Sequence, residues 1–342
     1  MDKDLNPHYI NIIFVKESVE SLKPFLYSLL DLTNLSFRII SNGCNRDEEQ
    51  ILINLCNKSE KLIFLSMNSS KVIEHGKVLD YLLELEPTDF FSFMDSDIFA
   101  IGPISYRDIL PADNEVAISS CLPVWHSNID LTMPKTSKIM AGQFIKDTED
   151  DFLGCTYLAS YRCRELRDLI KSMGLSFKSY HKKELPPKVF ITLKKLGFDK
   201  SIYDTAKVIN ILLQDRGHKL SYRNINNLIH IGGFSGEIKP SIYNFASLIK
   251  DILRNYLPRN LIAFINSRRF NCSKEEADNI IEIKNRRVEI CTLIKEIENN
   301  TLLSDASARV LKKNPDLKKL VNLYSTYSNH IDQTPATSEQ LI

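Results

Sequence analysis

The sequence predicts an α/β fold with a mostly parallel central sheet, followed by an all-helical C-terminal region. From residue 9 to residue 119, short apolar runs alternate with segments whose apolar residues recur at helical spacing. Such alternation is typical of parallel strands joined by right-handed crossovers. From about residue 241 only the helical spacing remains. We therefore divide the chain into an α/β domain at 1–240, a helical region at 241–331 and a polar, flexible tail at 332–342.

The alternating elements follow one another in order. A buried strand is predicted at 9–15, and in the helix that follows it Pro24 is tolerated because we place it in the first turn. Further strands are predicted at 37–41, 62–65, 90–94 and 116–119, and helices at 51–56 and 78–83.

The helical region is predicted to contain helices at 255–268, 274–299 and 315–328. Ser273 and Glu276 fit a capping box at the start of the second of these helices. One apolar stripe is expected along the same helix, formed by Val288, Cys291, Ile294 and Ile297.

Composition excludes several classes of function. The 342 residues are 43% hydrophobic and 25% charged, as in a globular protein with a large core. The 44 Lys and Arg residues nearly cancel the 43 Asp and Glu residues, so we predict no nucleic-acid partner. The seven cysteines are scattered without a Cys-x-x-Cys pair, which favours reduced thiols and a cytoplasmic location. The polar start argues against a signal peptide, and the lack of a long apolar run argues against a membrane span.

The most informative segment is the apolar run 90–94, which is followed by Asp95-Ser96-Asp97. Side chains alternate along an extended strand, so two carboxylates one residue apart can share a face. Ligands of α/β sheets bind at the carboxyl ends of strands, where carboxylates suit Mg²⁺ or Mn²⁺ held together with a diphosphate. The alternative is a strand that runs into an Asp-rich turn.

Two flanking segments extend the pattern. The first, 75–83, begins with His75-Gly76-Lys77 and precedes this strand, and the second is Ile101-Gly102-Pro103, which follows the two acids. Together they resemble the centre of the nucleotide-sugar glycosyltransferases with the type-A fold, specifically the inverting family-two-like group. The resemblance implies a Rossmann-like type-A glycosyltransferase fold with its catalytic domain at 1–240. It also implies transfer of a sugar from a UDP- or GDP-linked donor to a hydroxyl group, with inversion and dependent on Mn²⁺ or Mg²⁺.

The resemblance assigns residues to the donor site. Asp95 and Asp97 would hold the metal, and His230, before a Gly-Gly turn, would join the metal or the diphosphate. The residues expected to surround the nucleotide are Ser41, Asn42, His75, Gly76, Asp95, Ser96 and Asp97. Family members usually have an Asp that contacts the nucleotide base where Ser41 stands, so the identity of that base stays open. The alternatives are an Asn-Gly turn into a helix capped by Asn45, a partly exposed histidine on a helix at 75, and a hydrogen-bonded core histidine at 230.

Asp204 matches the acid that serves as general base in this family, where it takes the proton from the attacking hydroxyl. The family often has a Glu-Asp pair at this point, whereas Tyr203 precedes the acid here. A helix N-cap is the alternative role.

The acceptor is less defined. The segment 152–159 resembles the acceptor-side strand of the family, with an ordinary buried strand as the alternative. The resemblance implies a glycan, lipid-linked or protein acceptor in surface glycan or glycoconjugate synthesis. Basic and apolar residues interleave from 241 to 270, as in a helix at the anionic inner face of a membrane or in two core-packing helices with solvated charges.

Two rival functions stay open. A haloacid-dehalogenase-like phosphatase would use Asp95 and Asp97 as nucleophile and acid, although that class normally carries its motif on the first strand. Here three strand–helix units precede the motif. The second rival is a non-catalytic, glycosyltransferase-like scaffold protein.

Overall fold

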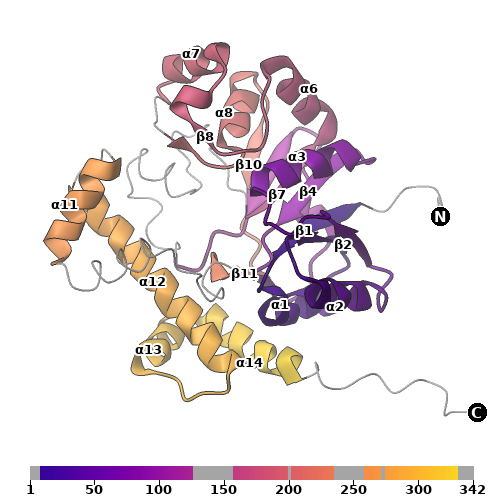
Figure 1. Ribbon diagram of the computed structural model, residues 1–342, viewed down its shortest axis with the longest axis vertical. Helices are drawn as coiled ribbons and strands as arrows, with labels where there is room; N and C mark the ends of the chain where they lie inside the picture. Colours follow the sequence, from indigo (N-terminus) through magenta and orange to yellow (C-terminus); the bar gives the residue numbers. More distant parts are fainter. Residues whose placement is uncertain (1–7, 126–156, 199–201, 235–257, 271–273, 330–342) are drawn as a thin grey trace, which may run out of the picture.

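The computed structural model describes residues 8–125, 157–198, 202–234, 258–270 and 274–329. A central sheet lies between two layers of helices, and a further group of helices covers one end of the molecule (Figure 1).

The strands of the central sheet are β1 (Tyr9–Val15), β2 (Ser36–Asn42), β3 (Leu62–Ser66), β4 (Phe90–Met94), β6 (Ala117–Ser120), β7 (Leu158–Arg162) and β10 (Leu220–Tyr222). Two small antiparallel pairs are β5 (Ile98–Ala100) with β11 (Leu228–His230), and β8 (Tyr180–His181) with β9 (Ile202–Tyr203). The five predicted strands are confirmed, each within one residue at either end. Of the predicted acceptor-side strand only 157–159 is described, and Leu158 opens β7.

The helices beside the sheet are α1 (Val19–Leu32), α2 (Arg46–Cys56), α3 (His75–Leu85), α4 (Tyr106–Ile109), α6 (Cys163–Met173), α7 (Pro187–Lys195) and α8 (Lys207–Asp215), with a short 3₁₀ turn, η1 (Lys182–Glu184). The C-terminal helices are α11 (Arg259–Phe270), α12 (Lys274–Glu298), α13 (Asp305–Lys313) and α14 (Pro315–Asn329).

The order of strands in the sheet is β10-β6-β7-β4-β1-β2-β3. Neighbouring strands are parallel except around β7, which runs antiparallel to both β4 and β6. The sheet is thus mostly parallel, and the fold is the Rossmann-like α/β arrangement that the sequence predicts. The carboxyl end of β4 lies in the middle of this sheet, where ligands of such folds bind.

Local sequence signals explain individual helix starts. The Asn45 side chain accepts from the Glu48 N–H at 2.9 Å while the Glu48 carboxylate accepts from the Asn45 N–H at 3.0 Å, so a capping box opens α2 and the alternative reading of Asn45 is confirmed. The placement of Pro24 in a first turn is wrong. Because α1 begins at Val19, the proline lies in the second turn and cannot donate to the ladder there.

Each face of the sheet carries its own apolar core. Ile12 and Phe14 point into the core beneath α1 and α2, whereas Ile13 packs against the core beneath α3, α6, α7 and α8. Both faces are therefore covered, as expected for a parallel sheet built from near-continuous apolar strands.

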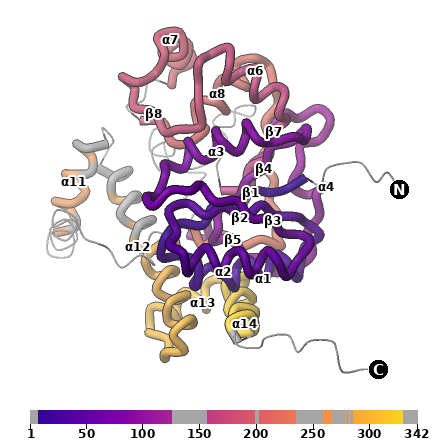
Figure 2. Tube along the Cα trace, turned by 45° about the vertical axis from the view of Figure 1, so that its right-hand side comes forward, coloured from indigo at the N-terminus to yellow at the C-terminus, as the bar shows by residue number. Residues whose placement is uncertain are grey.

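The C-terminal helices share the core of α1. The Tyr324 ring on α14 packs edge-on against Phe25 of α1, and its hydroxyl donates to the Ser21 carbonyl at 3.3 Å. Figures 1 and 2 both place α12, α13 and α14 on the α1 side, away from α6, α7 and α8. The predicted boundary at 240 lies outside the described residues, as do Ser273 and the tail 332–342, so the division into domains stays a prediction.

The predicted apolar stripe of α12 needs correction. Val288 is 49% exposed, and among the α12 side chains that the structure describes the buried ones are Ile290, Cys291, Leu293 and Ile294. α12 packs against α11, α13 and α14, so its buried residues extend beyond the single stripe that the spacing predicts. In the described part of the chain, no helix combines the length and the apolar character needed to span a bilayer.

Candidate metal and nucleotide site

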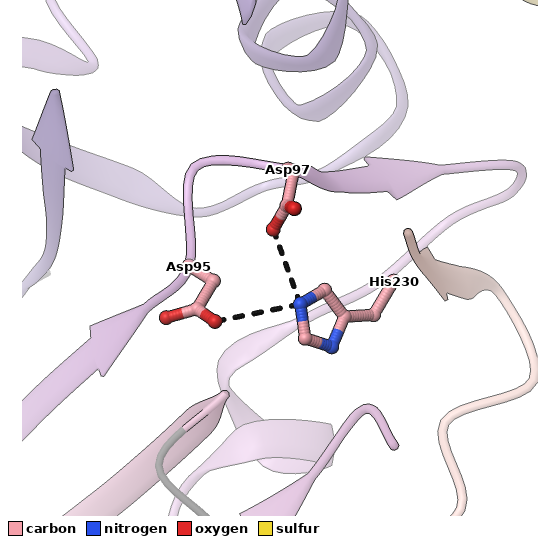
Figure 3. A group of neighbouring side chains, drawn as sticks. All are labelled: Asp95, Asp97 and His230. Carbon is pink, nitrogen blue, oxygen red and sulfur yellow. Dashed lines mark hydrogen bonds and ion pairs between the residues drawn. The ribbon is translucent and has the colours of Figure 1, made fainter. Parts of the chain in front are cut away.

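Three side chains converge beside the carboxyl end of β4 (Figure 3). Asp95 follows β4, Asp97 precedes β5, and His230 ends β11. The antiparallel pairing of β5 with β11 sets His230 opposite Ile98, and the Ile231 N–H donates to the Asp97 carbonyl at 3.1 Å. The pairing brings two segments more than a hundred residues apart to one point.

The arrangement of the three side chains fits a divalent cation. His230 Nε2 lies 3.4 Å from Asp95 Oδ2 and 3.1 Å from Asp97 Oδ1, and one ligand atom from each residue falls within 4.8 Å of the others. His230 Nδ1 lies 2.7 Å from the Cys121 carbonyl oxygen, to which it donates, so Nε2 is the nitrogen left facing the carboxylates. Metal-binding histidines are oriented by the same kind of second hydrogen bond. One imidazole and two carboxylates suit Mn²⁺ better than Mg²⁺.

The pKa values of Asp95, Asp97 and His230 depend strongly on one another. Burial alone would lower the pKa of His230, but the two carboxylates outweigh it and raise that pKa to about 10. Burial would raise the pKa of Asp97, yet the charge and hydrogen bond of His230, with the Phe234 N–H, lower it. Burial raises the pKa of Asp95, while His230 opposes the shift. Without a cation, His230 therefore carries the positive charge that a metal would supply.

The two carboxylates differ in access. The side chain of Asp97 is only 4% exposed, and its Oδ2 accepts from the Phe234 N–H at 2.8 Å. The side chain of Asp95 is 32% exposed. Asp97 is thus fixed from the protein side, and Asp95 keeps a face open to an incoming ligand.

A cavity of about 260 Å³ adjoins the cluster. It is bordered by Asp95, Ser96 and Asp97 together with Ile13, Val15, Asn42, Val72, Ile73, His75, Met94 and Gly233. Apolar and polar side chains both border it, as in many small-molecule sites.

Five of the seven predicted nucleotide residues border this cavity, namely Asn42, His75, Asp95, Ser96 and Asp97. The Asn42 amide exchanges two hydrogen bonds with the backbone of Ile73, at 2.9 and 2.8 Å, and so holds one wall in place. The close backbone approach that Gly76 permits is to Lys178, whose Cα would lie 2.4 Å from a Cβ at position 76.

Ser41 lies beside an acid that the sequence did not suggest. Its hydroxyl donates to Glu49 Oε1 at 2.7 Å, and the Ser66 hydroxyl donates to the same oxygen at 2.6 Å. A carboxylate from α2 thus stands at the end of β2, where the family resemblance implies an Asp.

Asp204 is partly exposed and precedes α8. Its Oδ1 accepts from the Ser179 hydroxyl at 3.2 Å and from the Thr205 N–H at 2.8 Å. The residue at the N-cap of α8 is Ala206, which makes no side-chain cap, so the alternative reading of Asp204 as the helix cap is wrong.

His75 links Asp204 to the metal cluster electrostatically. Burial lowers the pKa of His75, although Asp95 and Asp204 both lie near enough to oppose the shift. The ring also packs edge-on against Phe93, with centroids 6.3 Å apart. A neutral imidazole therefore borders the cavity within electrostatic range of both Asp95 and Asp204.

The groups that sequence reasoning missed act largely through the backbone. The Cys121 carbonyl orients His230, and the Phe234 N–H binds Asp97. Backbone roles leave no residue signature, and the only signal was the Gly232-Gly233 pair, which we took as a turn. Both glycines have positive φ, +77° and +83°, and allow the chain to curl around Asp97.

Comparison with known proteins finds only a distant structural similarity. No protein-family model matches the sequence, and no curated protein matches it. Among solved structures the chain is similar to an active-site mutant of LgtC, a glycosyltransferase, with a TM-score of 0.41 and 11% identity over 64% of this chain and 73% of that one. A similarity this low assigns neither family nor function, so the inverting family-two-like assignment stays a prediction.

Proposed function

We propose that this chain is a metal-dependent glycosyltransferase that moves a sugar from a UDP- or GDP-linked donor to an acceptor hydroxyl with inversion. The observation that carries the proposal is the convergence of Asp95, Asp97 and His230 beside a cavity at the carboxyl end of β4. A hard-ligand cluster next to a cavity of this kind suits a cation bound jointly with a diphosphate.

Each residue has a role in the proposal. Asp95, Asp97 and His230 hold Mn²⁺ or Mg²⁺, which when bound neutralises charge on the departing diphosphate. Asn42, His75 and Ser96 border the nucleotide, with Ser41 and Gly76 behind them. Asp204 accepts the proton of the acceptor hydroxyl as its oxygen bonds to the anomeric carbon. The bond from that carbon to the diphosphate breaks, and its electron pair leaves with the diphosphate.

The rival functions have weaker support. A phosphatase would need Asp97 as a proton donor, but its carboxylate is buried, hydrogen-bonded by Phe234 and His230, and has a lowered pKa. A non-catalytic scaffold has no need of an imidazole held by Cys121 toward two carboxylates.

The cellular setting is part of the proposal. In the described residues, Cys44, Cys56 and Cys163 are buried free thiols, which supports a cytoplasmic location. Leu261, Phe264 and Ile265 are exposed on α11, between 41% and 52%, which supports peripheral contact with the inner face of a membrane and a lipid-linked or other glycan acceptor. Sedimentation with anionic vesicles at low salt tests the contact, and a protein that stays in solution there contradicts it.

Calorimetry with UDP and GDP, with and without Mn²⁺, tests the donor site. We expect one nucleotide to bind only in the presence of the metal, and Asp95→Asn to lose that binding. Metal-independent binding, or none of either nucleotide, contradicts the proposal. The anomeric configuration of the product, followed by NMR, tests inversion.

A further inference from the structure

The C-terminal helix α12 carries an arginine on its buried face. Arg287 precedes Ile290, Cys291 and Ile294 by three, four and seven positions, so all four lie on one side of the helix. The three apolar residues are at most 5% exposed and belong to the core shared with α1. The buried turn that follows Arg287 thus anchors it and directs it toward the α/β fold.

Arg287 packs against Gly233, a residue that borders the cavity beside the metal cluster. A Cβ placed on Gly233 would lie 2.8 Å from both Cζ and Nε of Arg287 and 3.2 Å from Nη1. Gly233 itself borders the cavity. Gly233 thus contacts both the cavity and the guanidinium group, and any larger residue at 233 would occupy the contact.

The cavity needs a cation that its own wall does not supply. Among the described residues that border it, Asp95 and Asp97 are the acids, and none is a lysine or an arginine. A divalent cation offsets these two carboxylates, and the charge of a bound diphosphate is then left without a counter-charge.

We propose that Arg287 binds the diphosphate group of the donor, reaching it past Gly233, and stabilises the negative charge that develops as the diphosphate leaves. The inference rests on the proposed function. A guanidinium group suits this task because its fork of donors matches phosphate oxygens and stays charged at every working pH. Charge stabilisation aimed at the leaving group contributes directly to the rate. The C-terminal helices thereby supply a residue to the donor site of the α/β fold.

The test compares two neighbouring arginines. Arg287→Gln removes the proposed contact, and Arg286→Gln removes the same charge from a residue that pairs with Glu282 at 2.7 Å instead. The probe is inorganic pyrophosphate with Mn²⁺, measured by calorimetry, with Mn²⁺ alone as the reference. We expect Arg287→Gln to weaken pyrophosphate binding by about 10- to 100-fold, as for loss of charged hydrogen bonds, and Arg286→Gln to leave it unchanged.

The outcomes separate this inference from the proposed function. If the wild-type protein binds neither pyrophosphate nor UDP nor GDP with Mn²⁺, both fall. If it binds them and Arg287→Gln binds them equally well, Arg287 has no contact with the diphosphate and the inference alone is wrong. A purely structural arginine predicts equal losses for Mn²⁺ alone and for pyrophosphate, with a lower melting temperature, and overturns it too. Arg287→Lys should recover part of the pyrophosphate affinity, because it keeps the charge but not the fork.

Discussion

The two sides of the candidate site are built differently. On the sealed side, Asp97 and His230 are almost fully buried and each polar atom of their side chains has a partner in the chain, including the Cys121 carbonyl and the Phe234 N–H. On the open side, Asp95 and Asp204 keep part of their surface exposed, and Asp95 borders the cavity.

The difference separates residues that stabilise the folded site from residues that can contact a ligand. A charged pair buried on the sealed side is costly to disturb, because removing one partner leaves the other unpaired in a low dielectric. Groups on the open side are free to change partners when a ligand arrives. Substitutions on the sealed side should therefore affect both stability and binding, and those on the open side should affect mainly function.

The largest effect is expected at Asp97. Asp97→Ala removes the partner of both the His230 imidazolium and the Phe234 N–H, and should lower the free energy of unfolding by about 3–5 kcal/mol. Mn²⁺ binding should disappear as well. Urea denaturation of the metal-free protein and calorimetry with Mn²⁺ measure the two losses.

Asp97→Asn is the matched control, because an amide oxygen still accepts the Phe234 N–H. It should recover part of the stability but not the metal. Unaltered stability in Asp97→Ala would mean that the sealed side is not as rigid as its hydrogen bonds indicate.

Asp95→Asn should show the opposite balance. Its side chain faces the cavity and Asp97 remains to pair with His230, so the unfolding midpoint should fall much less than in Asp97→Ala while metal-dependent nucleotide binding is lost. Differential scanning fluorimetry with and without Mn²⁺ and UDP or GDP gives both readings in one experiment. A variant that unfolds as readily as Asp97→Ala would erase the contrast between the two sides.

Asp204→Asn should leave donor binding intact and lower turnover by about 10²–10⁴-fold, the usual range for a lost general base. The Asn side-chain oxygen can still accept from Ser179 and Thr205, so local structure is kept. Steady-state kinetics at saturating donor measure the effect, and turnover at the wild-type rate would remove Asp204 from the mechanism.

Much of the sheet could be predicted from sequence because its strands are short apolar runs with polar ends. The metal cluster could be predicted in part, because Asp95 and Asp97 share a strand end. Its third member needed the family resemblance, since only the pairing of β5 with β11 brings His230 across.

Other features could not be predicted. The Cys121 carbonyl and the Phe234 N–H are backbone groups, which every residue has. Arg287 lies on α12, and its approach to Gly233 depends on how that helix packs, which periodicity alone does not fix. Even the face of α12 was misjudged at Val288, because the spacing of apolar residues allows two neighbouring stripes.

The smallest predicted effect is a pH dependence that links the two sides. The folded pKa of His230 is raised to about 10, well above its ordinary value, so the imidazolium stabilises the metal-free protein fully below about pH 6.5. That stabilisation is lost as the pH rises through the folded pKa.

A metal must displace the Nε2 proton of His230, so the metal affinity should rise by up to about tenfold per pH unit over the same window. From about pH 6 to about pH 8, the Mn²⁺ affinity should therefore increase and the Mn²⁺-induced rise in melting temperature should grow. Calorimetry in buffers of different ionisation enthalpy should also detect close to one proton released per Mn²⁺ bound. His230→Gln, which has no proton to lose, is the control and should bind weakly with a nearly flat pH profile. A wild-type profile as flat as that of the variant would show that His230 does not contact the metal. The role of His230 on the sealed side would then be structural only.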